Sequence, residues 1–429
     1  MQNTNNKKIL FIITYKYPYD FGESFIENEL PFLSEKFYKI YFINTESDNT
    51  IKNIKFYLPK NSEVIILNQS LNFFRKLFSL KYLFFSPVFK QEIHIIKTVY
   101  KQKISFGIIK TLLISLLNGD RLSRRLENII LNKCDDLDKC YLYSYWCTDN
   151  AYSIAKLKIK HPQIKAFTRA HGWDIYFERA KYNYLPLRSF ILKNLDKIFS
   201  ISKNGKDYIL KKISSTEEDF QHLSSKIAIN RLGTKAVALK NFEKNKNCIK
   251  IVSIFFITKI KRINLLIEAL SLIKDVSVKW YHIGGGVDFD LVKSYALKKI
   301  KGKTNIVYHF LGTKNKEDIY DLLNQNIDLS INVSSSEGIP VSIMEAMSFG
   351  IPVIATDVGG NSEIVNNDNG ILLPPNPTAQ EVADAIVKFD NLTQKQILEY
   401  KQNAYNTWNK KYNAEKNYTE FVEQILELQ

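Results

Sequence analysis

Residues 327–360, IDLSINVSSSEGIPVSIMEAMSFGIPVIATDVGG, decide the fold of this 429-residue chain. An apolar strand is predicted to end near Val333, and the serines Ser334–Ser336 with Gly338 predict a turn. Pro340 then stands at the start of a helix, where its missing N–H costs nothing. A strand, a tight turn and a helix in this order form the repeating unit of a parallel α/β sheet.

Short apolar runs alternate with helical patterns along the whole chain, which predicts an α/β fold with two doubly wound, Rossmann-like halves. A polar run, Lys235–Asn247, predicts the linker between the halves. We therefore expect an N-terminal domain over 1–240, a C-terminal domain over 241–405, and a last helix over 406–429 that packs back on the N-terminal domain. The predicted strands are Lys8–Thr14, Ile40–Asn44, Val64–Leu67, Cys140–Tyr145, Ile164–Thr168, Ile198–Ser202, Ile227–Asn230, Ile249–Ile257, Val278–Ile283, Ile306–Leu311, Ile327–Val333 and Ile351–Ala355.

The formal charge of +16 admits nucleic acid or anionic lipid as a partner. A general lysine bias explains the charge equally well, and no arginine-rich face or stacking motif supports nucleic acid. The longest apolar stretch, Ile104–Leu117, is interrupted by Lys110 and is too short to span a bilayer. The four cysteines have no zinc-like or disulfide-like spacing. These features predict a cytoplasmic protein that is soluble or peripheral at the inner face of the plasma membrane.

The turn before the predicted helix is a candidate ligand site. Free amides around Gly338 and Ile339, next to Pro340, lie at the positive end of a helix and suit an anionic or hydroxyl-rich ligand. Glu337 precedes this helix and Glu345 lies on it. One carboxylate can accept bonds from two vicinal hydroxyls of a sugar ring or a ribose.

Residues 334–365, SSSEGIPVSIMEAMSFGIPVIATDVGGNSEIV, closely resemble the donor-site signature of glycosyltransferase family 4, with its Glu-x7-Glu hallmark. The resemblance covers the C-terminal half and, more weakly, the N-terminal half. It implies a GT-B fold, in which two Rossmann-like domains face each other across a cleft. It also implies net retention, a UDP- or GDP-linked sugar donor, and neither a metal nor another cofactor. Glu337 would contact the donor sugar, and Glu345 would bind the ribose.

Residues 251–270, IVSIFFITKIKRINLLIEAL, resemble the phosphate-binding segment of this family. Lys261 aligns with its lysine, whereas Phe255-Phe256 replaces the usual Gly-Arg pair. We expect the neighbouring Arg262 to supply the missing guanidinium to the diphosphate. The alternative for both cations is a solvated basic turn before a helix.

Two glycine turns follow predicted strands in the C-terminal half, one at Gly284 and Gly285 and the other at Gly312. Glycine lets the main chain approach a base or a phosphate closely, so these residues are candidate donor contacts. The same turns are also needed simply to leave a strand.

The N-terminal half carries two further candidates. In residues 14–30, TYKYPYDFGESFIENEL, a capping box of Ser24 and Glu27 would place Gly22 and Glu23 at a helix entrance. This stretch resembles the family's N-terminal glycine loop, which faces the diphosphate.

Residues 169–174, RAHGWD, resemble a family motif in which the histidine lies beside the donor sugar, which is His171 here. A structural histidine is the alternative. Asp174 either orients His171 or binds the acceptor.

Two other features have simpler explanations. Asp288 and Asp290 match the Asp-x-Asp metal motif of another glycosyltransferase fold, but aspartates are also favoured at a helix start, and we expect no metal there. The aromatic and basic stretch Leu71–Lys90 fits either an interfacial helix on an anionic membrane or the core-facing side of a crossover helix.

The sequence thus predicts a metal-independent, retaining hexosyltransferase that uses a nucleotide sugar and a glycan or lipid-linked acceptor in cell-surface polysaccharide synthesis. Its catalytic residues would be His171, Lys261 and Glu337. One rival is a GT-B-type epimerase or hydrolase acting on the nucleotide sugar alone. Another is a non-catalytic basic protein that binds membrane or nucleic acid.

Overall fold

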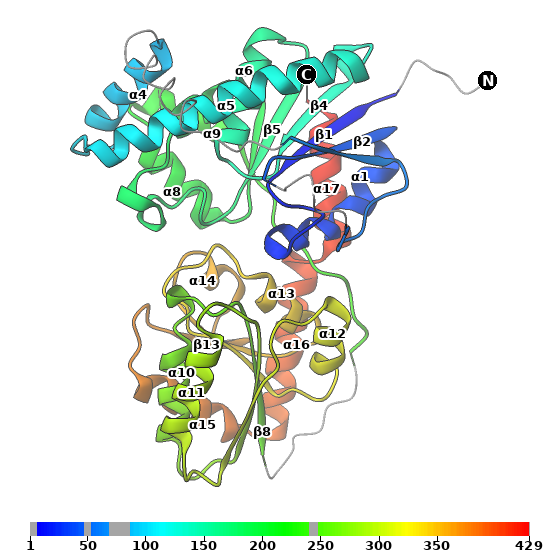
Figure 1. The fold of residues 1–429 in the computed structure, drawn as a ribbon. Coiled ribbons are helices and arrows are strands. Elements are labelled where there is room, and N and C mark those ends of the chain that lie inside the picture. Colours follow the sequence, from blue (N-terminus) through cyan, green and yellow to red (C-terminus); the bar gives the residue numbers. More distant parts are fainter. Residues whose placement is uncertain (1–6, 47–52, 68–85, 240–247, 429) are drawn as a thin grey trace. The chain divides into compact units, whose positions relative to one another are not determined.

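The computed structural model describes residues 7–46, 53–67, 86–239 and 248–428. The chain divides into two compact units. The first contains residues up to Arg231 and from Tyr418 onward, and the second contains Leu232–Asn417. Figure 1 shows the ribbon, with many of the elements labelled. Of the predicted linker, residues 240–247 lie outside the described residues.

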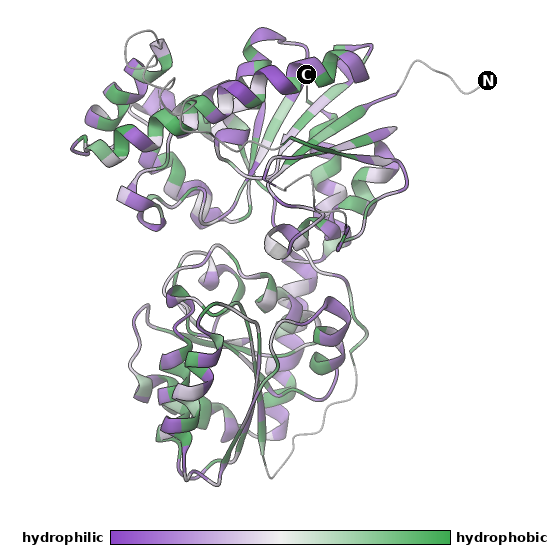
Figure 2. Ribbon diagram, in the orientation of Figure 1, coloured by the Kyte–Doolittle hydropathy of each residue, from purple (hydrophilic) through white to green (hydrophobic). Residues whose placement is uncertain are grey.

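The first unit is built on a seven-stranded parallel sheet with the order β3-β2-β1-β4-β5-β6-β7. Its strands read as nearly continuous apolar runs because both faces of the sheet are covered, and Figure 2 shows them mostly green. They are β1 (Ile9–Thr14), β2 (Lys39–Asn44), β3 (Ser62–Ile66), β4 (Cys140–Ser144), β5 (Lys165–Ala170), β6 (Lys197–Ser200) and β7 (Ile227–Ile229).

Helices cover both faces of this sheet. Side chains of α4 to α9 form one core with Phe11 and Ile13, whereas α1 and α17 pack with Leu10 and Ile12 on the other face. This two-sided cover is the doubly wound arrangement that the sequence predicted. The helices are α1 (Leu30–Lys36), α4 (Pro87–Thr98), α5 (Phe106–Lys133), α6 (Asp149–Lys160), α7 (Arg188–Asn194), α8 (Lys203–Ile213), α9 (Glu217–Lys226) and α17 (Ala414–Leu426), with short 3-10 turns at Phe21–Asn28, Leu137–Lys139, Phe177–Arg179 and Lys181–Asn183.

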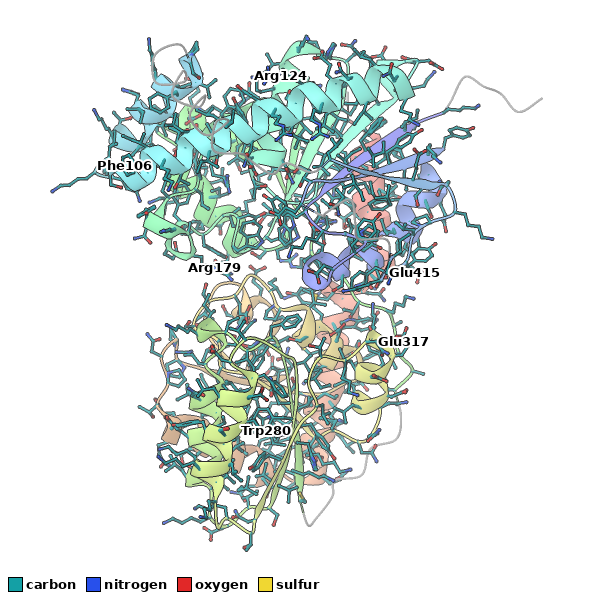
Figure 3. The ribbon with its side chains drawn as sticks, viewed as in Figure 1. Phe106, Arg124, Arg179, Trp280, Glu317 and Glu415 are labelled. Atoms are coloured by element: carbon teal, nitrogen blue, oxygen red, sulfur yellow. The ribbon has the colours of Figure 1, made fainter. Side chains whose placement is uncertain are left out.

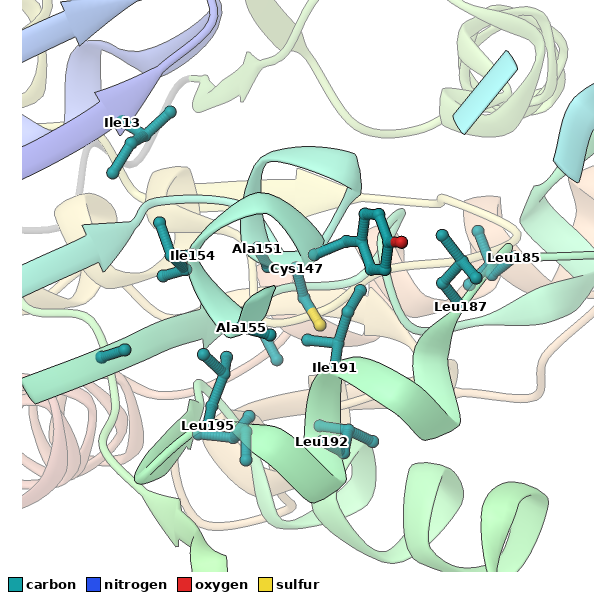
Figure 4. Close-up of a cluster of buried hydrophobic side chains, with 14 of the residues drawn as sticks. Ile13, Cys147, Ala151, Ile154, Ala155, Leu185, Leu187, Ile191, Leu192 and Leu195 are labelled. Carbon is teal, nitrogen blue, oxygen red and sulfur yellow. The ribbon is translucent and has the colours of Figure 1, made fainter. Parts of the chain in front are cut away.

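Figure 4 shows part of the first core, where Cys147 lies among Ala151 and Ile154 of α6 and Ile191 of α7. Burial raises the pKa of the Cys147 thiol to about 12, so the group behaves as a small apolar side chain at neutral pH. All four cysteines of the chain are free thiols.

The second unit contains a six-stranded parallel sheet with the order β10-β9-β8-β11-β12-β13. Its strands are β8 (Ile249–Ile254), β9 (Val278–Ile283), β10 (Ile306–Phe310), β11 (Leu329–Asn332), β12 (Val353–Thr356) and β13 (Gly370–Leu373). Its helices are α10 (Ile263–Leu272), α11 (Phe289–Ile300), α12 (Lys316–Leu323), α13 (Val341–Ser348), α14 (Asn361–Ile364), α15 (Ala379–Asp390) and α16 (Gln394–Lys411), with a 3-10 turn at Lys259–Lys261.

This sheet is also covered on both sides. Helices α10, α11 and α15 share a core with Ile251 and Trp280, the latter labelled in Figure 3, and α12 and α13 pack with Val252 and Ile283 on the opposite face. Alternate residues of each strand therefore face opposite helix layers. The second unit is a doubly wound domain as well.

The C-terminal stretch 406–429 is divided between the units. Helix α16 ends at Lys411 within the second unit, whereas the residues of α17 from Tyr418 onward belong to the first. There the ring centroid of Phe421 lies 4.1 Å from the guanidinium carbon of Arg169, which is buried and donates to Glu29 at 2.8 Å. Across the described residues, no helix is long and apolar enough to cross a membrane.

Candidate active site

The turn between β11 and α13 is held by hydrogen bonds with Asn332 at the end of β11 and with Thr356 at the end of β12. The Oδ1 atom of Asn332 accepts the N–H of Ser334 at 3.1 Å, and Thr356 donates its hydroxyl to the carbonyl of Ser334. Pro340 caps α13, and its carbonyl accepts the N–H of Ile343 at 3.1 Å. In the described part of the chain, nothing accepts the N–H groups of Gly338 and Ile339. Two unpaired N–H groups therefore lie at the start of this helix.

The carboxylate of Glu337 lies at the centre of this turn and is 6% exposed. Its Oε1 atom is 2.5 Å from Nζ of Lys261 and accepts Nδ2 of Asn332 at 3.2 Å. The ammonium compensates the cost of burying the carboxylate charge. The fold thus brings together two of the predicted site residues and adds Asn332, which the sequence analysis had not selected.

Two glycines hold the backbone at Glu337. Gly359 has a φ of 56°, and a Cβ on it would lie 1.8 Å from the carbonyl oxygen of Glu337. The N–H of Gly360 donates to the carbonyl of Gly338 at 2.7 Å. Only glycine permits this close approach, so the loop after β12 fixes the turn that presents Glu337.

Glu345 is on α13 and lacks a side-chain hydrogen bond to any described residue. Burial raises the pKa of its carboxyl to about 7, and only the charge of Lys316 opposes this shift. The buried hydroxyl of Tyr320 on α12 also has no partner within the described part of the chain. Burial, and secondarily the Glu345 charge, raises the pKa of Tyr320. A carboxyl and a hydroxyl with unused capacity thus lie near one another on adjacent helices.

Arg262 differs from its expected role. It adopts a left-handed conformation with a φ of 49°, and its side chain turns back onto the protein. The guanidinium donates to the carbonyls of Val333 (2.6 Å), Ser334 (2.8 Å) and Pro375 (2.9 Å) and to Oδ1 of Asn376 (3.1 Å). Four of the five N–H groups of the guanidinium are thus used within the protein. The side chain connects the loop at Val333 and Ser334 with the loop at Pro375 and Asn376, and only one N–H group is left for a diphosphate.

The glycine turns of the second unit have a structural reason. Gly284 has a φ of 143°, and a Cβ there would lie 1.9 Å from the carbonyl oxygen of Phe255. Its N–H donates to Gly312 at 2.9 Å, and Gly285 accepts the N–H of Ile257 at 2.8 Å. These contacts favour the reading in which the glycines let neighbouring strand ends approach.

Asp288 and Asp290 lie at the start of α11. Within the described residues, no group of three or more His, Cys, Asp or Glu side chains is arranged to hold a metal ion.

Glu23 in the first unit also differs from its expected role. Its carboxylate is 2% exposed and accepts the backbone N–H groups of Tyr15 (3.0 Å), Lys16 (2.7 Å) and Tyr17 (2.8 Å) and the indole N–H of Trp146 (2.6 Å). These four bonds occupy the carboxylate and fix the loop after β1. Glu23 therefore shapes this loop instead of presenting a free acceptor to a substrate.

The predicted capping box is absent. Residues Phe21–Asn28 form a kinked 3-10 turn, and Oε1 of Glu27 accepts the N–H of Tyr57 at 2.7 Å. Gly22 is exposed on this turn.

His171 follows β5 and is buried in an aromatic group. Its ring centroid lies 4.4 Å from that of Trp146 and 5.2 Å from that of Tyr145. Both ring nitrogens are buried and lack a hydrogen-bond partner among the described residues, and burial lowers the pKa of the imidazole. The imidazole is therefore favoured in its neutral form, and the hydrogen-bonding capacity of its two nitrogens is unused within the described structure.

Asp174 holds the backbone beside this imidazole. Its carboxylate is fully buried and accepts the N–H groups of His171 (2.7 Å) and Cys147 (2.9 Å). Nδ1 of His171 is 3.7 Å from Oδ2 of Asp174, which is beyond hydrogen-bonding distance. Of the two expected roles, this burial favours positioning of the His171 segment over binding of an acceptor.

Tryptophans near His171 were missed by the sequence analysis. Trp173 is 40% exposed, and its ring lies 5.1 Å from Trp146 and 6.4 Å from Tyr15. The sequence could have indicated Trp173 as a candidate site residue, because this large aromatic residue lies in the loop that follows the end of β5.

Comparisons with known proteins agree with this architecture. Residues 236–407 match the model of the family described as glycosyl transferases group 1. Solved structures of the same shape include Anabaena HepE in complex with UDP and glucose (TM-score 0.65, 15% identity, 98% of this chain and 100% of that chain). Another is sucrose-phosphate synthase from Thermosynechococcus elongatus (TM-score 0.71, 13% identity, 98% and 99%).

Sequence relatives include the O-antigen biosynthesis glycosyltransferase WbnH of Escherichia coli, which is 26% identical over 52% of this chain and 60% of its own length. The putative colanic acid biosynthesis glycosyltransferase WcaL of Escherichia coli K12 is 27% identical over 53% and 56%. An uncharacterized glycosyltransferase of Methanocaldococcus jannaschii is 29% identical over 63% and 69%. The matches to the two Escherichia coli proteins span under two thirds of their length.

Two Rossmann-like domains with this strand order, matched over nearly the whole chain, define a protein of the GT-B fold. Residues 236–407, which match the family model of glycosyl transferases group 1, contain Lys261, Glu337 and Glu345.

Proposed function

We propose that the chain is a retaining glycosyltransferase that moves a hexose from a nucleoside diphosphate to a glycan or lipid-linked acceptor in cell-surface polysaccharide synthesis. The observation that carries the proposal is the meeting of Lys261, Glu337 and the free amides before α13 within the group 1 domain. A cation, a carboxylate and helix-start amides match the phosphates and hydroxyls of a nucleotide sugar. The names of the O-antigen and colanic acid relatives support the polysaccharide role.

In the proposed reaction, the bond between the anomeric carbon and the phosphate oxygen breaks, and the acceptor oxygen bonds to the same face of that carbon. Negative charge develops on the leaving diphosphate, where Lys261 and the N–H groups of Gly338 and Ile339 would stabilise it. A leaving phosphate oxygen accepts the proton of the acceptor hydroxyl. The reaction therefore needs neither a protein base nor a metal ion.

The ion pair between Lys261 and Glu337 leaves polar atoms of both side chains free for these proposed contacts. Lys261 uses one N–H on Glu337, which leaves two for phosphate oxygens. Glu337 uses Oε1 on Lys261 and Asn332, which leaves Oε2 for a sugar hydroxyl. We propose that the unused capacity of Glu345 binds the ribose and that a ring nitrogen of His171 bonds to the donor sugar.

A thermal-shift panel of UDP-, GDP- and ADP-sugars tests the proposal, because a ligand that binds the native state raises its apparent stability. We expect one UDP- or GDP-sugar to raise the unfolding midpoint and then to yield a glycosylated product with an acceptor glycan. Because the similar HepE structure is a complex with UDP, UDP-sugars are the first donors to test. Stabilisation by no donor would count against the proposal, and release of free sugar regardless of acceptor would favour the hydrolase alternative.

A further inference from the structure

The segment from α4 to the middle of α5 has an unusual charge distribution. Its exposed lysines are Lys90, Lys97, Lys101, Lys103 and Lys110, and none forms an ion pair with a described residue. The only carboxylate between Ser86 and Gly119 is Glu92, which is 1% exposed. Glu92 accepts the hydroxyl of Tyr184 at 2.9 Å and the N–H of Leu187 at 3.0 Å. The solvent-facing charge of this segment is therefore entirely positive.

An aromatic ring stands among these lysines. Phe106, the first residue of α5, is 82% exposed, more than any other aromatic residue that the structure describes. Figure 3 labels it at the N-terminal end of α5, at the edge of the first unit. Ser105 caps the helix by accepting the N–H of Ile108 at 3.3 Å, which fixes the backbone that presents the ring.

A second segment joins this surface. Tyr182 is 45% exposed, and its ring fills the space above Gly107, where a Cβ would lie 2.3 Å from the ring. The neighbouring Lys181 is also exposed, and its Nζ lies 5.1 Å from the ring centroid of Tyr182. Gln102 donates its side-chain N–H to the carbonyl of Asn183 at 2.6 Å. The two segments are 81 residues apart in sequence, yet they form one continuous face.

The backbone of this face is strained. Six non-glycine residues in the described chain have positive φ, and three lie on this face: Lys101 (52°), Tyr182 (65°) and Asn183 (50°). A fourth, Leu187 (63°), is buried and donates its N–H to Glu92 at 3.0 Å. Such conformations cost free energy and persist where the surrounding structure requires them, often at functional sites. The exposed ring and cations are thus held by a specific local structure and do not belong to a random loop.

We propose that this face, which comprises Phe106, Tyr182 and the surrounding lysines Lys97, Lys101, Lys103, Lys110 and Lys181, binds the surface of a membrane rich in anionic lipid. Lysines attract the anionic headgroups, and an exposed ring inserts at the headgroup boundary. Nucleic acid fits less well, because the described face combines isolated point charges with a protruding apolar ring and has no arginine fork. The predicted interfacial stretch Leu71–Lys90 lies mostly outside the described residues, so the proposed surface is a different one.

Vesicle flotation with the full chain tests this surface without any sugar donor, so its outcome is independent of the proposed transfer reaction. Wild-type protein should bind vesicles of phosphatidylcholine with about 30% phosphatidylglycerol at low salt, and lose most binding at high salt. Lys101→Glu with Lys103→Glu should lower the partition coefficient by roughly twentyfold or more, at about fivefold per lysine. Phe106→Ser should lower it by roughly tenfold.

Matched controls separate a local surface from the overall positive charge. Lys298→Glu with Lys299→Glu and Leu297→Ser make the same kinds of change at exposed positions of α11 and should leave binding nearly intact. Thermal unfolding of each variant verifies folding. Equal loss with the α11 variants, or no binding by the wild type, overturns the proposal. So does tight binding of a single-stranded oligonucleotide that the Lys101/Lys103 variant selectively loses, which would assign the face to nucleic acid.

Discussion

Oε1 of Glu337 lies 2.5 Å from Nζ of Lys261, although the two residues are 76 positions apart in sequence. This pair links the strand-to-helix turn before α10 with the turn before α13. Neither charge can be removed without leaving its largely buried partner uncompensated. Substitutions at the two positions should therefore not be additive, and each must be compared with the double variant.

Glu337→Gln tests the proposed sugar contact. The amide keeps the shape and one acceptor oxygen but loses the charge, so turnover should fall by about tenfold to a hundredfold, as for loss of a charged hydrogen bond. Nucleoside diphosphate affinity, measured by calorimetry, should change little. If nucleotide affinity fell in parallel with turnover, Glu337 would contact the nucleotide and not the sugar.

Glu345→Gln tests the proposed ribose contact and its pH dependence. The pKa of this carboxyl is raised to about 7, so the ionised form that accepts ribose hydroxyls grows as pH rises from 6 to 8. Nucleotide affinity of the wild type should rise over this range, and the Gln variant should bind weakly with a flat pH profile. If the nucleotide affinity of the wild type did not change with pH, Glu345 would not take part in nucleotide binding.

Arg262→Ala tests the loop-fastening role of this guanidinium. Loss of its bonds to three carbonyls and Asn376 should lower the free energy of unfolding by about 2–3 kcal/mol. Arg262→Lys should recover only part, because one ammonium cannot reproduce the planar fork. Lys261→Ala is the comparison: it should reduce turnover far more than stability. If Arg262→Ala had normal stability but no turnover, Arg262 would instead bind the diphosphate.

Glu92→Gln tests the effect of burial on α4. Burial raises the pKa of Glu92 from 4.5 to about 7, so the folded state favours the protonated form. The resulting stabilisation, about 3 kcal/mol at most, is complete below the unfolded pKa and is lost as pH rises through about 7. The unfolding midpoint of the wild type should therefore fall between pH 6 and 8 more than that of the variant. Glu35→Gln, at an exposed site, should behave like the wild type.

Chelation tests the source of the positive charge at the diphosphate. Because Lys261 and the amides before α13 are proposed to supply it, transfer activity should survive EDTA. Abolition by EDTA with rescue by manganese would instead give Asp288 and Asp290 a catalytic role.

Most of the fold could be read from the sequence. All twelve predicted strands are present, because buried parallel strands appear as apolar runs bounded by turn residues. The thirteenth, β13 (Gly370–Leu373), was missed. It has four residues, begins with glycine and is followed by Pro374-Pro375, so it has little strand pattern of its own. Its pairing with β12 defines it, and this pairing cannot be seen locally.

The sequence predicted those parts of the candidate site that depend on backbone conformation. It did not predict those that depend on the direction of a side chain. The turn around Glu337 follows from its glycines and Pro340. The directions of Glu23 and Arg262 do not, because loops distant in sequence supply their partners, as Trp146 and Pro375 do. Asn332 was missed because its role depends on the distance to Glu337 and not on a motif.

The return of α17 to the first unit has a consequence for synthesis on the ribosome. Phe421 and Ile425 complete the core that contains Leu10, Ile12 and Phe167, yet they are synthesised only after the whole of the second unit. Translation of the intervening Leu232–Asn417 takes roughly 10–40 s at typical rates. During that interval, the first unit lacks the apolar cover that Phe421 and Ile425 supply next to Arg169. We expect a chaperone to bind the exposed apolar side chains. A premature stop before Tyr418 would leave that face permanently open to proteolysis.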